Sequence, residues 1–172
     1  MTEPHIIDDL ALPHPRAATG TDWQLVSDRV MGGVSSGGLS REVVSGHPAL
    51  RLQGDVRLDN DGGFVQAALD LAPDGAALDA RPWRAIALDV AGNGQSYNLH
   101  LRTADVTRPW QSYRATFTAH PDWSLVELPF TRFAPHRLDA PLDLSTLRRI
   151  GLVAIGRAFR ADLAVARIAL IA

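Results

Sequence analysis

One strand-like segment carries the residue pattern that most clearly indicates a functional surface. Asn98, His100 and Arg102 alternate with Leu99 and Leu101, so the polar and the apolar side chains lie on opposite faces of the strand. An antiparallel sandwich normally buries one face of each strand and leaves the other in water. The three polar residues are therefore either an ordinary solvated face or the donors and acceptors of a binding surface.

A binding surface at this strand should receive further polar groups from the neighbouring strands. We expect Gln111 and Tyr113 on the next strand, with Glu127 as a further candidate. Arg102 would present a planar fork of donors to a carboxylate, a phosphate or a pair of sugar hydroxyls. His100 would add a contact that depends on pH.

Three segments have the outline of catalytic or metal-binding motifs but lack the context that those motifs need. Residues 33–37 match G-x-S-x-G, yet another glycine and a strand-like run follow where a nucleophile elbow needs a helix. Residues 92–94 are too short for a dinucleotide fingerprint. Residues 59–62 resemble the start of a calcium loop without its later glutamate. We therefore expect no catalytic residues, no metal ligands and no cofactor, and hence no enzyme.

Composition excludes several further kinds of chemistry. The chain has no cysteine, which removes disulfides and thiolate catalysis. It also has no lysine, so all seventeen basic residues are arginine and no Schiff-base or phosphate-loop lysine exists. The formal net charge of -2 offers nothing to attract nucleic acid. An arginine-rich, lysine-free composition is typical of GC-rich bacterial genomes.

The N-terminal segment differs from the rest of the chain. It is acidic, and its apolar residues are interrupted by Pro13 and Pro15, unlike those of a signal peptide. No apolar run reaches the length of a membrane span. We expect a cytoplasmic protein in which residues 1–20 form a loosely ordered leader and residues 21–172 form one domain.

The pattern beyond this leader is that of short strands separated by turns. Residues 92–94 look like a hairpin turn, and residues 59–63 form another glycine-containing turn. Helical spacing is missing from every long segment, although residues 142–149 allow one turn capped by Asp143 or Ser145. This organisation predicts an all-β sandwich or barrel. The clearest strands are 85–90, 97–102, 124–128, 149–155 and 163–171.

The order of the motifs resembles one known family. Trp23 with residues 27–35, residues 59–64, residues 92–102, residues 113–135 and residues 150–163 are similar to successive motifs of the complex I intermediate-associated protein 30 family. The resemblance implies a jelly-roll β-sandwich of the galactose-binding-domain-like kind. It also implies an assembly factor or chaperone, because the founding mitochondrial member assists assembly of respiratory complex I. The chain departs from the family pattern after residue 64, where Gln66 and Ala68 replace Ser and Arg.

Two functional hypotheses follow from these observations. The first is a binding or assembly domain with a protein partner, such as a respiratory-complex subunit. The second is a carbohydrate-binding module that uses the polar concave sheet face, with Trp110 and Tyr113 as aromatic platforms. Asp28 and Arg29, beside a glycine-rich loop, are either a salt bridge that pins the loop or further binding residues. Neither hypothesis involves nucleic acid or a membrane span.

Overall fold

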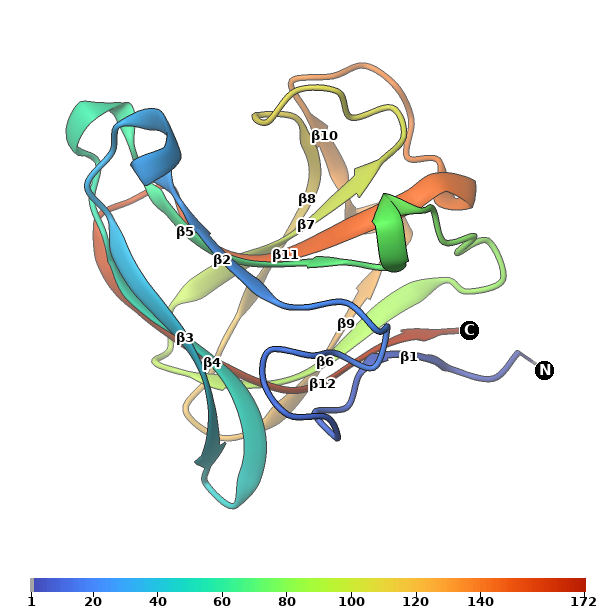
Figure 1. Cartoon of the computed structure of the whole chain (residues 1–172), viewed down its shortest axis with the longest axis horizontal. Helices are drawn as coiled ribbons and strands as arrows, with labels where there is room; N and C mark the ends of the chain where they lie inside the picture. Colours follow the sequence, from blue (N-terminus) through green and yellow to red (C-terminus); the bar gives the residue numbers. More distant parts are fainter. Residues whose placement is uncertain (1) are drawn as a thin grey trace.

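The computed structural model describes residues 2–172, which form two six-stranded antiparallel sheets packed face to face (Figure 1). This is the jelly-roll β-sandwich that the sequence predicts. The lower sheet in Figure 1 has the order β3-β4-β12-β6-β9, with β1 also paired to β12. Its strands are β1 (His5–Asp8), β3 (Ser36–Val44), β4 (His47–Val56), β6 (Ala85–Gly92), β9 (Ser124–Pro129) and β12 (Phe159–Ile171).

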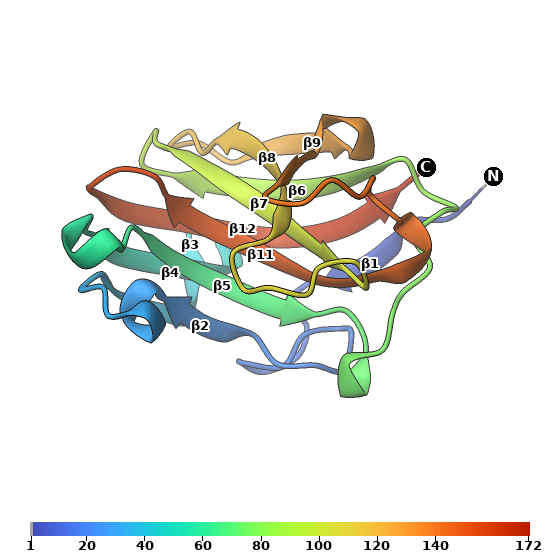
Figure 2. The same ribbon diagram turned by 90° about the horizontal axis from the view of Figure 1, so that it is seen from above.

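The upper sheet carries the polar strand. Its order is β10-β8-β7-β11-β5-β2, and Figure 2 shows β7, β11, β5 and β2 side by side. The predicted strands at 85–90, 97–102, 124–128, 149–155 and 163–171 are all confirmed, with ends that differ by a few residues. The strands of this sheet are β2 (Gln24–Ser27), β5 (Phe64–Asp70), β7 (Ser96–Thr103), β8 (Ser112–Thr118), β10 (Ala134–His136) and β11 (Leu147–Ile155).

Five single 3-10 turns are the only helical elements of residues 2–172. One of them is capped by Asp143, whose side chain accepts a hydrogen bond from the Ser145 N–H, as the sequence predicts. None of these turns is long or apolar enough to cross a membrane. They are η1 (Asp28–Met31), η2 (Asp59–Asp61), η3 (Pro73–Gly75), η4 (Phe130–Arg132) and η5 (Leu144–Thr146).

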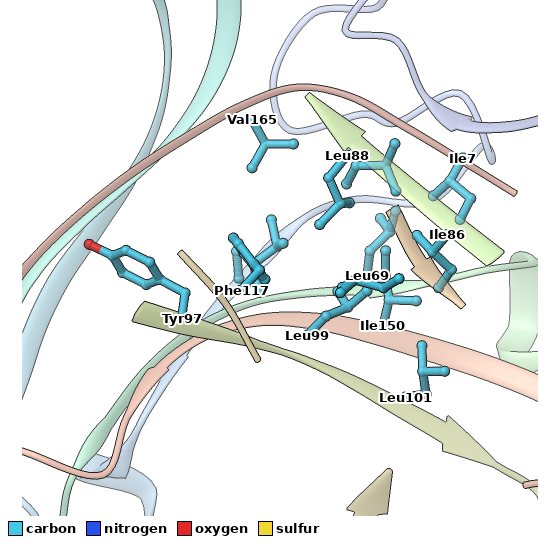
Figure 3. Close-up of a cluster of buried hydrophobic side chains, with 14 of the residues drawn as sticks. Ile7, Leu69, Ile86, Leu88, Tyr97, Leu99, Leu101, Phe117, Ile150 and Val165 are labelled. Carbon is cyan, nitrogen blue, oxygen red and sulfur yellow. The ribbon is translucent and has the colours of Figure 1, made fainter. Parts of the chain in front are cut away.

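The core lies between the two sheets (Figure 3). Leu99 and Leu101 project into it from β7, and Leu88 and Val165 meet them from the lower sheet. All of these side chains are almost fully buried. Burying one such side chain contributes roughly 1.5–3 kcal/mol, so the apolar alternation of β7 determines which of its faces turns outward.

Part of the N-terminal segment lies within the sandwich, which corrects the expectation of a loosely ordered leader. His5–Asp8 pair with the C-terminal half of β12, and Ile7 is fully buried. The buried Asp8 carboxylate accepts a hydrogen bond of 2.7 Å from the Trp23 indole N–H. The composition of the leader obscured this strand because only a short apolar stretch contributes to it.

The predicted hairpin at residues 92–94 is a second correction. The strands that flank it, β6 and β7, belong to different sheets and do not pair. The Asn93 side chain links the two sheets where the chain passes between them. Its amide donates to the Arg160 carbonyl of β12 and accepts from the Tyr97 hydroxyl of β7 at 2.6 Å. Turn residues indicate where a chain bends, but they do not indicate whether the next strand joins the same sheet.

Candidate functional site

The polar face of β7 forms the floor of a cleft on the outer side of the upper sheet. Cross-strand register aligns Arg102 with Arg149 of β11, and it aligns His100 with Gly151 of β11 and Arg114 of β8. Because directly opposed residues share a face, these side chains form two adjacent rows across the sheet. The prediction that the polar side chains of β7 point away from the core is confirmed.

Loops on both sides of this floor form the walls of the cleft. One wall comes from η1 and η2, which lie at the upper left in Figure 1. Val30 and Met31 line the cleft from η1, and Leu58, which directly precedes η2, lines it beside them. The opposite wall comes from residues 109–111 and from His136 of β10. The cleft between them has a volume of about 640 Å³. This size lies in the range of ordinary ligand pockets, roughly 300–1,000 Å³.

The structure brings three of the predicted site residues together in the cleft. His100, Arg102 and Gln111 all line it. Asn98 lies on the same face one row further along, where it accepts a hydrogen bond from Thr116. Its amide nitrogen is 3.4 Å from His100 Nε2. Glu127 lies on β9 in the other sheet and takes no part in the cleft.

Arg102 fixes the wall next to the floor. Its guanidinium donates to the carbonyl oxygen of Gln111 at 3.1 Å, and to those of Arg108 and Pro109 at 3.4 Å. The Gln111 amide oxygen accepts from the Thr107 and Arg108 backbone N–H groups. Burial lowers the pKa of Arg102, and repulsion from nearby arginines adds to this effect.

Tyr113 corrects the expectation that it would share the polar face. It is fully buried, and its hydroxyl donates to the Ala140 carbonyl at 2.7 Å. Strand β8 begins at Ser112, so alternation directs Ser112 and Arg114 into the cleft and Tyr113 into the core. Gln111 precedes the strand and reaches the cleft from the loop, independently of the alternation.

Arg114 and His136 are cleft residues that sequence reasoning missed. Arg114 lies directly opposite His100, and its Nε–H donates to Ser112 Oγ at 2.9 Å. Burial, followed by repulsion from Arg114, His136 and Arg102, lowers the pKa of His100 to about 3. Burial is also the main cause of the lowered pKa of His136. The alternation of side chains along β8 could have identified Arg114, but only if the strand had been predicted to begin at Ser112.

Asp28 holds the wall of η1 and η2 together. Its fully buried carboxylate accepts hydrogen bonds from the Ser35 N–H and hydroxyl and from the Gly63 and Phe64 N–H groups. Burial alone would raise the pKa of Asp28, but these hydrogen bonds together hold it below its usual value. A salt bridge between Asp28 and Arg29, one of the two alternatives that the sequence left open, is not formed, because successive residues of a 3-10 turn point in different directions. Arg29 instead donates to the Ser35 carbonyl at 2.7 Å.

The glycines of two sequence motifs surround this carboxylate. A Cβ at Gly33 or Gly62 would come within 2.5 Å of an Asp28 side-chain atom, so both positions require glycine. Gly63 has a φ of 138°, which confirms that the turn at 59–63 needs a residue with positive φ. Ser35, the serine of the G-x-S-x-G match, is fully buried against Asp28 and has no access to solvent.

The fold is shared with proteins of known structure. Several solved structures with the same fold are carbohydrate-binding modules from Clostridium thermocellum. A family 11 module of a cellulosomal cellulase is 18% identical with a TM-score of 0.76, and the match covers 99% of this chain and 95% of that one. The same family in complex with a β-1,3-1,4-mixed-linked tetrasaccharide is 17% identical, with a TM-score of 0.73 and coverage of 99% and 96%. A family 30 module of another cellulosomal cellulase is 15% identical, with a TM-score of 0.65 and coverage of 99% and 98%.

The chain thus has the β-sandwich fold of galactose-binding-like, carbohydrate-binding modules. Its family is shown by a sequence model that matches residues 14–165. The chain belongs to the complex I intermediate-associated protein 30 family. No curated protein sequence matches it.

Proposed function

We propose that this chain is a non-catalytic binding domain that captures a segment of a protein partner in the cleft above β7, β8 and β11. The carrying observation is the cleft itself, in which the side chains of a rigid sheet form the floor beneath two fixed walls. Membership of a family named for association with complex I intermediates supports a respiratory-complex subunit as the partner.

Apolar side chains at the rim of the cleft support a protein partner. Val30 is 75% exposed, Met31 57% and Leu58 50% on one wall, and Trp110 is 55% exposed on the other. Large apolar side chains gathered on a soluble surface commonly mark an interaction site. Aromatic and methionine side chains are also enriched in protein interfaces, so the rim has a suitable composition.

The chemistry of the cleft lining supports binding without catalysis. Within the described residues, Asp61 is the one carboxylate that lines the cleft. Hydrolysis of a glycosidic bond generally uses two carboxyl groups on either side of the bond. His100 is buried, and its pKa of about 3 makes it a poor general base at neutral pH because it binds a proton too weakly.

Photo-cross-linking tests whether the partner occupies the cleft. A benzoylphenylalanine in place of Trp110 should cross-link to a respiratory-complex subunit in the host, identified by mass spectrometry. The same group in place of Leu125, which is 60% exposed on the other sheet, should not. Adding Gly151→Leu should reduce the cross-link about tenfold or more, corresponding to about 1.4 kcal/mol, because the new side chain fills the floor.

The Gly151→Leu variant has a matched control. A Cβ at Gly151 meets only the side chain of Gln66, so the leucine displaces a flexible group rather than the core. Gly38 has open space around its Cβ position on the edge strand β3, so Gly38→Leu makes the same change away from the cleft. Equal cross-linking from positions 110 and 125, or an unchanged yield with Gly151→Leu, would contradict the proposal.

A carbohydrate ligand is the second candidate function. It is favoured by the fold shared with carbohydrate-binding modules and by the exposed Trp110 ring at the rim. If this function is correct, a mixed-linked β-1,3-1,4-glucan tetrasaccharide should change the tryptophan fluorescence saturably. The Trp110→Ala variant should abolish the change, whereas Leu125→Ala should retain it. A flat titration up to millimolar tetrasaccharide would exclude this ligand.

A further inference from the structure

Building on the proposed function, we infer that Arg114 binds the carboxylate of an acidic side chain in the partner's segment, with Arg102 and His136 beside it. The ligand class is therefore an acidic peptide with apolar residues on either side of the acid. Three features support this binding mode. They are the ion-pair partners of the floor arginines, the charge around Arg114, and the apolar walls of the cleft.

Arg114 has unused donors that face the cleft. Its Nε–H donates to Ser112 Oγ, while its two terminal nitrogens form no hydrogen bond with any residue of 2–172. No carboxylate within the described chain forms an ion pair with it. A guanidinium presents its N–H groups in a fixed fork that matches the two oxygens of a carboxylate. A partly buried fork without a carboxylate is therefore prepared for an external one.

The arginines of the floor differ in whether a carboxylate pairs with them. Arg149, on the same floor, forms an ion pair with Asp70 at 2.7 Å. Arg51 on the other sheet forms one with Asp162 at 2.8 Å. Within the floor, Arg102 and Arg114, at the end formed by β7, β8 and β10, form no ion pair with a carboxylate of the described residues. The overall charge of the chain is -2, so this positive end is not a consequence of bulk composition.

The cross-strand neighbours of Arg114 carry no negative charge. Its opposite neighbour is His100, and β10 brings His136 next to Ser112. Burial, with repulsion from Arg137, lowers the pKa of Arg114. Burial also lowers the pKa of His136, with repulsion from Arg114 and Arg137. A bound carboxylate would offset the repulsion between Arg114 and Arg137 with an attraction, in the way that arginine clusters recognise acidic motifs.

The walls favour a peptide over an acidic sugar as the source of the carboxylate. Val30, Met31 and Leu58 are aliphatic or thioether side chains, which suit the apolar side chains of a peptide. Trp110 and Pro109 face them from the other wall. An apolar residue on each side of a central acid would therefore contact both walls while the acid reached the floor.

Nuclear magnetic resonance titration of the whole chain tests this inference. The probe is a capped heptapeptide with one glutamate between two leucines, and its counterpart has glutamine in place of the glutamate. The glutamate peptide should shift the Arg114 Nε–H and His136 ring signals saturably. The glutamine peptide should bind at least about tenfold more weakly, because hydrogen bonds to a charged group are lost.

Variants separate the role of Arg114 from general electrostatics. Arg114→Gln should make the two peptides bind equally, and Arg114→Lys should restore only part of the preference. Arg160→Gln removes the same charge from the other sheet, where Arg160 pairs with Asp55, and should leave the preference intact. Circular dichroism and melting curves of each variant show whether it remains folded.

Specific outcomes would overturn the inference. Equal binding of both peptides by the unmodified chain would exclude carboxylate recognition. Saturation of the Arg114 signal by oligogalacturonate but not by the glutamate peptide would exclude a protein segment. Undiminished cross-linking from position 110 in an Arg114→Gln chain would overturn this inference and leave the proposed function standing. Absence of cross-linking from benzoylphenylalanine at position 110 in a chain with Arg114 intact would instead contradict the proposed function.

Discussion

Replacement of Asp28 by alanine is expected to destabilise the domain by more than about 3 kcal/mol. The change removes the acceptor for two hydrogen bonds from Ser35 and for those from the Gly63 and Phe64 N–H groups. A buried donor left without an acceptor costs roughly 1–3 kcal/mol, and at least two of these donors are buried. Urea denaturation at pH 7 measures the loss as a lower free energy of unfolding.

The same loop offers a matched control for this substitution. Asp59 forms only an exposed ion pair with Arg57, so Asp59→Ala should change the free energy of unfolding by less than about 1 kcal/mol. The Asp28→Asn variant keeps the shape but places an amide donor against backbone donors, and it should also be clearly destabilised. Similar denaturation midpoints for Asp28→Ala and Asp59→Ala would show that the buried carboxylate does not hold the wall.

The individual strands were predictable because apolar alternation is a local property. Segments such as 97–102 have to bury Leu99 and Leu101, and the structure places both in the core. The arrangement of the strands was less accessible. Consecutive strands β6 and β7 lie in different sheets, and β1 pairs with β12 from the opposite end of the chain. These pairings depend on long-range packing, to which turn residues and short apolar stretches give no direct guide.

The candidate site was predictable only on its central strand. Alternation along β7 correctly separated His100 and Arg102 from the core. The same rule led to Tyr113 instead of Arg114, because the strand begins one residue later than Gln111. The walls of the cleft could not be deduced from the sequence. They form because the buried Asp28 carboxylate of η1 accepts a hydrogen bond from the turn at 59–63, which is a long-range contact.

The position of Asp28 also explains why two glycine-rich motifs that lie far apart in the chain pack around the same carboxylate. Gly33 and Gly62 approach the same carboxylate from two loops, and the two loops carry Met31 and Leu58 at the rim of the cleft. Through Asp28, the two glycines therefore help to position the loops that carry the apolar rim. A substitution at either glycine should affect stability before it affects recognition.

The domain is expected to lose about 2 kcal/mol of stability between pH 7 and pH 5 because of His100. Burial, together with Arg114, His136 and Arg102, lowers the pKa of this histidine to about 3 in the folded chain, against 6.5 for an unperturbed histidine. Between these two pKa values, the His100 ring is protonated in the unfolded chain and neutral in the folded chain. Stability is therefore unaffected above pH 6.5 and decreases as pH falls towards 3, by about 1.4 kcal/mol per unit.

Urea denaturation at pH 7 and at pH 5 measures this effect with little contribution from carboxyl groups, whose ordinary pKa values lie lower. His100→Gln should remove most of the difference between the two pH values, because glutamine is neutral at both. His136→Gln is the control: His136 has a pKa lowered in the same direction but is only partly buried, so most of the difference should remain. Coincident denaturation curves for the unmodified chain at pH 7 and pH 5 would mean that His100 accepts a proton in the folded state. The floor of the cleft would then be open to water at His100, and its arginines would lie in a more polar setting than the structure describes.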